Sequence, residues 1–128
     1  MASHNQLGKE AEQLAVDYLV QHGYEILHCN WRYSRYEIDI IATKNELLRI
    51  IEVKSLKTSQ LRYPEESVTK KKFSYLARAA DEFLFHNKQY RHVQFDILSI
   101  ILNPQKDPEY FLIEDVFCRQ QCGIHSED

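Results

Sequence analysis

The segment EIDIIATKNELLRIIEVK, residues 37–54, combines a strand pattern with charges that a purely structural strand does not need. Two runs rich in Ile and Leu flank a short polar break at Asn45 and Glu46, which predicts a β-hairpin. Charged residues nevertheless stand inside both runs. Because burying charges is costly, this hairpin is expected to present a functional site as well as a hydrophobic face.

Pairing around a two-residue turn determines which charges face one another. If the two strands pair antiparallel around Asn45 and Glu46, Asp39 lies opposite Glu52. The same register puts Glu37 opposite Lys54, on the same face. Directly opposed carboxylates repel each other, so something must offset the repulsion between Asp39 and Glu52.

This face also carries Ile41, Leu48 and Ile50, so we expect it to be partly covered, with the first helix of the chain as the candidate cover. Burial and mutual repulsion would raise the pKa values of the two carboxyl groups unless a cation is bound. Mg²⁺ takes oxygen ligands and usually keeps waters for a phosphate substrate. The pair of Asp39 and Glu52 is therefore a candidate site for Mg²⁺ or Mn²⁺.

Hydrophobic periodicity outlines the remaining elements. We expect NWRYSR, residues 30–35, to be a polar and aromatic loop. The expected elements are a helix over 7–22, strands over 24–29, 36–43 and 47–55, a helix over 68–86, and strands over 92–101 and 109–117. A helix between two strands provides the crossover that parallel neighbours need. We predict one α/β domain over 1–117, with a mixed five-stranded sheet flanked by two main helices in the order αβββαββ, and a polar tail over 118–128.

Composition limits the class of protein. A hydrophobic content of 44% in 128 residues suits one compact domain. No run of about 18 apolar residues occurs, and the first residues lack the pattern of a secretory signal. Three cysteines are too few for a disulfide framework, which favours a reducing compartment. We expect a cytoplasmic protein without a membrane segment.

Charge is distributed unevenly along the chain, although the formal net charge is only -3. Residues 44–78 hold nine Lys or Arg against four Glu. A local excess of this kind either attracts polyanions or simply keeps a helix and its flanking loops in water. For a charge run considered alone, we favour the second role, the solvation of a helix and its flanking loops.

Two further acids need an assignment. Glu12 borders the apolar stripe of the first helix and is a candidate third metal ligand, although helix geometry alone favours a surface glutamate. Asp96 stands between Phe95 and Ile97, so alternation puts it on the face opposite those two residues. We interpret Asp96 as structural.

At this point the residues match a known pattern. Asp39 followed by Glu52-Val53-Lys54 on the next strand resembles the Asp…Glu-x-Lys core of restriction-endonuclease-like nucleases. From Gly8 to about Phe117 the chain resembles the YraN family, uncharacterised bacterial proteins regarded as distant relatives of archaeal Holliday-junction resolvases. The segments that carry this resemblance are GKEAEQLA (8–15), YLVQHGYEIL (18–27), NWR (30–32), EIDIIA (37–42), IEVK (51–54) and FDIL (95–98).

The resemblance implies an endonuclease that hydrolyses DNA and selects branched or junction structures. It implies Glu12, Asp39 and Glu52 as ligands of Mg²⁺ or Mn²⁺, with Lys54 beside them to position water. Flanking carboxylates are expected to keep Lys54 protonated. A homodimer is also implied, because resolvase relatives act as dimers. The residues expected to hold the sugar-phosphate backbone are Arg32, Arg35, Lys70, Lys71, Lys72 and Arg78.

Two other interpretations stay open. A non-catalytic nucleic-acid-binding protein of the same fold, acting as a partner subunit, would use the same basic surface. A small interaction domain would use the hairpin charges only as a structural network. The aromatic residues Trp31, Tyr33 and Tyr36 either stack on unpaired bases or pack over the end of the sheet.

Overall fold

A computed structural model describes residues 2–57 and 70–116, with side chains described from Gly8 onward and not at Lys70. The predicted domain end at 117 and the predicted tail over 118–128 lie outside the described residues. The elements are α1 (Ala2–Gln21), β1 (Glu25–Tyr33), β2 (Tyr36–Lys44), β3 (Leu47–Lys57), α2 (Lys70–His86), β4 (Val93–Asn103) and β5 (Lys106–Ile113). This order confirms the predicted α/β fold with the arrangement αβββαββ.

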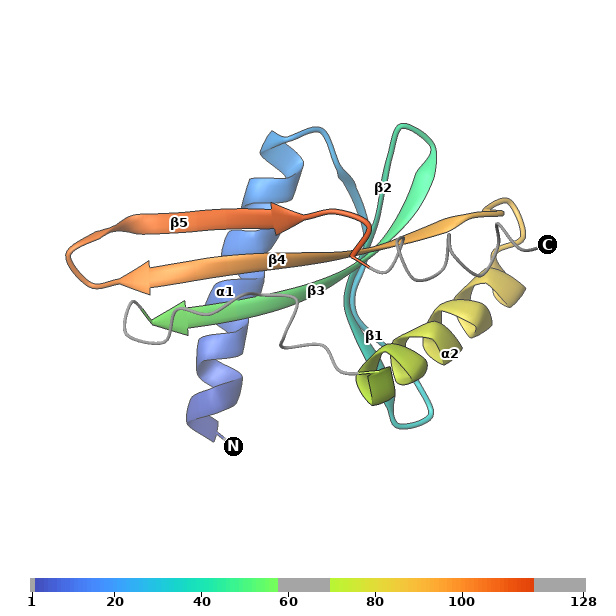
Figure 1. Cartoon of the computed structure of the whole chain (residues 1–128), viewed down its shortest axis with the longest axis horizontal. Coiled ribbons are helices and arrows are strands. Elements are labelled where there is room, and N and C mark those ends of the chain that lie inside the picture. Colours follow the sequence, from blue (N-terminus) through green and yellow to red (C-terminus); the bar gives the residue numbers. More distant parts are fainter. Residues whose placement is uncertain (1, 58–69, 117–128) are drawn as a thin grey trace.

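The five strands form one mixed sheet in the order β1-β2-β3-β4-β5. Strands β3 and β4 run parallel, and all other neighbours are antiparallel. Parallel neighbours need a long connection, and α2 lies within it. In Figure 1, β3, β4 and β5 run side by side, whereas β1 and β2 turn steeply away from them. The sheet is therefore strongly twisted across β2 and β3.

The two helices cover opposite faces of this sheet (Figure 1). Helix α1 packs Ala11, Ala15 and Leu19 against one face, where Ile40 and Ile51 lie. The opposite face is covered by α2, whose contribution is Leu76, Ala79, Ala80 and Phe83. Within the described residues, neither helix has the length and apolar character needed to cross a membrane.

The cover of the charged face differs from the prediction. Ile41, Leu48 and Ile50 belong to the cluster built by α2, and not to the one built by the first helix. Side chains alternate along β3, and α1 already occupies the face to which Ile51 points. The residues on either side of Ile51 therefore point to the other face. That face is covered by α2, the helix in the connection between β3 and β4.

The predicted loop over 30–35 is wrong for residues 30–33, and only 34–35 form a turn. Strand β1 continues to Tyr33, where Trp31 and Arg32 pair with Ile38 and Glu37. The Trp31 ring packs edge-on against Phe83, with ring centroids 5.5 Å apart. Packing against α2 therefore extends a strand through a segment whose polar residues suggested a turn.

The predicted two-residue turn of the central hairpin is confirmed. Asn45 and Glu46 have φ values of 54° and 66°, as the turn types preferred by two-residue hairpins require. Thr43 then pairs with Leu48, and Lys44 pairs with Leu47, in the expected register.

Changing Glu46 should test how firmly the turn sets this register. Glu46→Gly should raise the free energy of unfolding by about 1 kcal/mol, because glycine adopts a positive φ without the steric penalty of a Cβ. Glu46→Val should lower it, since a β-branched residue is poorly accommodated there. Urea unfolding measures both. Equal stability of the two variants would contradict the turn.

Candidate active site

The site lies where β2 separates from β3. Their pairing runs from Lys44–Leu47 to Ile40–Ile51, the last pair in the ladder. The next residues, Asp39 and Glu52, do not pair through their backbones. Instead, the backbone N–H of Val53 donates a hydrogen bond to Asp39 Oδ2 over 2.8 Å. A side chain thus replaces the strand partner that Val53 would otherwise have on β2.

The predicted opposition of Glu37 and Lys54 does not form. Beyond Ile40, β2 pairs with β1, and Glu37 accepts a hydrogen bond from Arg32 Nε at 3.0 Å. The prediction assumed one straight ladder along the whole hairpin. The twist between β2 and β3 ends that ladder before it reaches Glu37.

Glu52 is in contact with α2 through Lys72, and Asp39 forms a carboxylate pair with Glu52. The Glu52 side chain is only 8% exposed, and Asp39 is half-buried. Burial, and then the charge of Glu52, raise the pKa of Asp39 to about 7, although the hydrogen bond from Val53 acts in the opposite direction. The expected upward shift is therefore confirmed for Asp39.

Two lysines neutralise this pair. Lys54 Nζ lies 3.9 Å from Glu52 Oε2. Lys72, in the first turn of α2, forms an ion pair with the same oxygen atom. Burial, and then the neighbouring ammonium of Lys72, lower the pKa of Lys54, although Glu52 and Asp39 oppose the shift. Burial and the ammonium of Lys72, which the sequence does not place beside Lys54, thus outweigh the flanking carboxylates, and the expectation that Lys54 stays protonated remains a prediction.

Glu12 is bound by a residue of β1. Its Oε2 accepts a hydrogen bond from Asn30 Nδ2 on β1, and Glu12 extends from α1, the helix on the opposite face of the sheet. Asn30 has a φ of 53° and stands between the pairs Cys29–Ile40 and Trp31–Ile38. This register puts Asn30 opposite Asp39. Sequence reasoning missed Asn30, and only its place in the NWR segment marked it.

The donor set suits a hard divalent cation only in part. Among the described residues, no three side chains of His, Cys, Asp or Glu form a group able to hold a metal ion. Asp39 and Glu52 nevertheless provide two adjacent carboxylates whose repulsion a cation would relieve. Mg²⁺ is often bound by one or two carboxylates together with waters and substrate phosphates. The pair therefore fits such an ion, and Glu12 as a third ligand stays a prediction.

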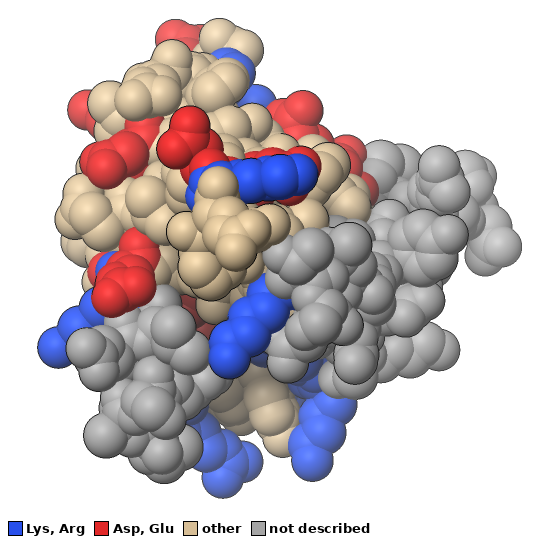
Figure 2. Space-filling view, turned by 90° about the vertical axis from the view of Figure 1, so that its left-hand side faces the viewer, with Lys and Arg blue, Asp and Glu red and all other residues tan. Residues whose placement is uncertain are grey.

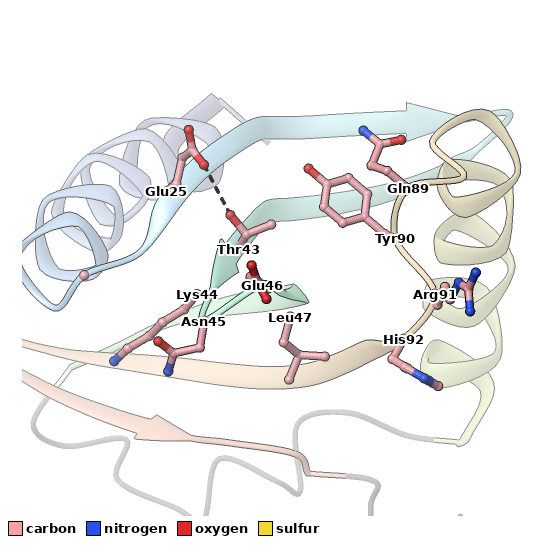
Figure 3. A pocket seen from close by; sticks show the side chains of 11 residues that line it. Glu25, Thr43, Lys44, Asn45, Glu46, Leu47, Gln89, Tyr90, Arg91 and His92 are labelled. Carbon is pink, nitrogen blue, oxygen red and sulfur yellow. Dashed lines mark hydrogen bonds between the residues drawn. The ribbon is translucent and has the colours of Figure 1, made fainter.

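A separate hollow of about 820 Å³ lies at the opposite end of the hairpin, around its turn (Figure 3). Its walls come from the β2–β3 turn and the loop between α2 and β4, with Glu25, Lys44 and Arg91 among them. The hollow contains none of the predicted ligands. Its charges are mixed, so the buried carboxylate pair is the better marker of chemistry.

Several predicted backbone-binding residues meet on one aromatic and basic ridge, which we define as Arg35, Tyr36, Lys71, Tyr75 and Arg78. The rings of Tyr36 and Tyr75 lie 5.0 Å apart, which joins the β1–β2 turn to α2. Arg35 stacks over Tyr36, Lys71 lies over Tyr75, and Arg78 donates to the Tyr36 hydroxyl. That last hydrogen bond lowers the pKa of Tyr36. The ridge is contiguous with the helix that carries Lys72.

The other residues predicted to contact nucleic acid do not belong to this ridge. Arg32 is exposed but paired with Glu37, and the side chain of Lys70 lies outside the described part. Trp31 packs against Phe83, so its ring is not free to stack on a base.

Charge is also distributed unevenly over the surface. On the face drawn in Figure 2, most acidic side chains occupy the upper half, while basic side chains project from the lower edge.

Asp96 belongs to a second buried polar cluster. It accepts hydrogen bonds from the backbone N–H of Asp115 at 2.8 Å and from Gln94 Nε2 at 2.9 Å. Buried Arg49 lies 3.8 Å from its carboxylate and 2.8 Å from Glu114. This cluster ties β3 and β4 to the segment after β5, in keeping with the structural role expected for Asp96.

The chain is similar to proteins of one family over most of its length. A family model described as uncharacterised protein family UPF0102 matches residues 11–100. A UPF0102 protein of Parabacteroides distasonis is 40% identical over 119 residues, covering 91% of this chain and 96% of the relative. A UPF0102 protein of Bacteroides thetaiotaomicron is 44% identical over 101 residues, or 79% of this chain and 84% of the relative. One from Chlorobium phaeobacteroides is 39% identical over 109 residues, or 84% and 86%.

The raised pKa of Asp39 predicts a pH dependence of stability. The folded chain binds this proton more tightly than the unfolded chain, whose carboxyl has the ordinary value of 3.8. Stability should therefore fall as pH rises from about 4 to about 7 in buffer with a chelator. Asp39→Asn keeps an acceptor for Val53 but cannot ionise, so its slope should be shallower. Urea unfolding at pH 4.5, 6 and 7.5 measures this, and identical slopes would contradict the site.

Proposed function

This chain belongs to the uncharacterised protein family UPF0102, and we propose that it is a metal-dependent endonuclease that hydrolyses phosphodiester bonds in DNA, with selectivity for branched or junction structures. The observation that carries the proposal is the convergence of Asp39, Glu52 and Lys54 where β2 leaves β3. A buried and a half-buried carboxylate beside an ammonium are costly for stability alone. Such a cluster is typical of a site that handles a cation and a phosphate.

Asp39 and Glu52 are the residues that would hold Mg²⁺ or Mn²⁺. When bound, such an ion polarises the scissile phosphate and lowers the pKa of an attached water. The hydrogen bond from Val53 fixes the Asp39 carboxylate, so the pair is oriented before substrate arrives. Lys54 provides a positive charge near the developing negative charge on the phosphate. Its lowered pKa reflects a partly dry setting, where that charge acts strongly.

The aromatic and basic ridge is the proposed path of the nucleic acid. Arginine and lysine contacts to phosphates release counterions and do not read sequence. The rings of Tyr36 and Tyr75 offer faces on which an unpaired base can stack, and Tyr33 lies next to them at 6.4 Å. Unpaired bases occur at branches and junctions. A surface of this kind therefore supports selection by structure rather than by sequence.

One observation favours the alternative of a non-catalytic nucleic-acid-binding subunit. The described residues hold no group of three metal-binding side chains, and Glu12 is engaged with Asn30. Under this alternative, Lys54 and Lys72 neutralise the carboxylates permanently. Binding of DNA would then be independent of divalent ions, which the following experiments distinguish.

Cleavage assays test the proposed reaction. Four-way junctions, flaps, duplexes and single strands are incubated with Mg²⁺ or Mn²⁺. Cleavage should be fastest on branched substrates and should vanish with chelator. Asp39→Asn and Lys54→Met should each lower the rate about a hundredfold or more, since the first removes a charge that would hold the metal and the second a charge that would stabilise the transition state.

Asp107→Asn, an exposed change on β5, is the matched control and should retain the full rate. A full rate in Lys54→Met would assign the activity to another site or to a contaminant. Tight binding of junctions without cleavage in either metal would support the non-catalytic subunit.

Salt dependence tests the ridge independently of cleavage. In chelator, the logarithm of the association constant for junction DNA should fall linearly with the logarithm of salt concentration. Arg35→Ala should reduce that slope by about 0.9, because one phosphate contact is lost. Arg91→Ala removes the same charge from the hollow around the turn and should leave the slope unchanged. Equal effects of both substitutions would mean that general charge, not the ridge, drives binding.

A further inference from the structure

Resting on the proposed function, we infer that Lys72 is the resident counter-ion of the active site, a competitor that a divalent cation must displace from Glu52. Lys72 comes from α2, outside the hairpin that carries the Asp…Glu-x-Lys pattern. Its ammonium forms an ion pair with one carboxylate oxygen of Glu52. That carboxylate is one of the two proposed to hold the metal.

In the ion pair between Lys72 and Glu52, the Glu52 end is buried and the Lys72 end is partly exposed. The Glu52 side chain is 8% exposed, while that of Lys72 is 38% exposed. The same oxygen, Oε2, lies 3.9 Å from Lys54 Nζ, so two ammonium groups converge on it. A cation approaching Glu52 therefore meets a carboxylate oxygen that is already engaged, by a lysine whose side chain is the more exposed of the two.

Charge balance explains why a divalent cation would displace Lys72 from Glu52. Asp39 and Glu52 carry two negative charges when ionised, and Lys54 and Lys72 carry two positive charges. A divalent cation added to this balanced group would leave an excess of positive charge in a buried position, which is unfavourable. Withdrawal of Lys72 reduces the excess, and a substrate phosphate balances the remainder.

Helix α2 gives an independent reason to regard Lys72 as more than a surface residue. Its first turn contains no acidic residue and begins Lys70-Lys71-Lys72. Positive charges at a helix N-terminus are opposed by the helix dipole, which favours anions there. The ion pair with Glu52 offsets this cost for Lys72. Once Glu52 is taken by metal, the same position favours a phosphate group as the next partner of Lys72.

This exchange of partners predicts effects of opposite sign. Lys72→Met should bind Mn²⁺ about tenfold more tightly, because a competing positive charge is gone. The same variant should bind junction DNA more weakly in the presence of Ca²⁺ as a non-cleaving ion. A residue that only supports the fold would weaken both. Calorimetry or the Mn²⁺ paramagnetic resonance signal measures metal affinity, and fluorescence anisotropy measures DNA binding.

Two variants control for charge and folding. Lys71→Met removes the same charge one residue away, where the side chain lies over Tyr75, and should change Mn²⁺ affinity less than about twofold. Lys72→Arg keeps the charge and should stay near the wild-type affinity. Unchanged or weaker Mn²⁺ binding by Lys72→Met would overturn the inference, as would equal tightening by Lys71→Met.

A further test uses the wild-type protein and so does not depend on whether a variant folds. The lysine Nζ and Cε signals of Lys72, followed by NMR, should move toward those of a solvent-exposed lysine as Mg²⁺ is added. Signals that stay fixed while Mg²⁺ saturates the site would overturn displacement. Failure of the proposed function has a different signature: Asp39→Asn and wild type would then bind Mn²⁺ equally.

Discussion

The hydrogen bond from the backbone N–H of Val53 to the carboxylate of Asp39 secures the place where two strands part. Twist separates β2 from β3 after the pair Ile40–Ile51, and an unsatisfied N–H at that point would be costly. Asp39 satisfies it through its side chain. The arrangement keeps the carboxylate beside Glu52 without a continuous ladder, so the site exists because the sheet opens there.

Two kinds of charge then have to coexist in a small, partly dry volume. Asp39 and Glu52 repel each other, and the two lysines that compensate them also repel each other. Either pair without the other would be unfavourable in a partly buried position. Taken together they approach neutrality, which makes the group tolerable in the folded chain and responsive to any ion that alters the balance. Sensitivity to incoming charge is what the proposed reaction requires.

Much of this architecture could be predicted from the chain itself. Period-two alternation and the Asn45-Glu46 turn specified the hairpin and its register near the turn, and the helix after β3 specified the parallel pair. A local sequence pattern predicts only the pairing that is set by residues near the turn. The twist that ends the ladder, and with it the expected pairing of Glu37 and Lys54, comes from packing across the whole sheet.

The site was harder to predict for the same reason. Asp39, Glu52 and Lys54 lie within one hairpin, so the register near its turn already indicates that they are close, although the ladder ends one pair before Asp39. Lys72 reaches them across a crossover, and only the position of α2 on the sheet places it there. Glu12 was expected on the basis of family resemblance, but its hydrogen bond to Asn30 depends on a left-handed residue that no periodicity indicates.

Strand β5 bears on how two copies of the chain could meet. It is an outer strand with one neighbour, and its first half, Lys106-Asp107-Pro108-Glu109, lies beside an irregularity in its pairing with β4. Proline offers no N–H to an incoming strand, and charges of this density discourage edge-to-edge addition. Sheet extension through the first half of β5 is thus disfavoured. A homodimer that avoids this segment would meet through the helices, the loops or the other edge strand of the sheet, β1.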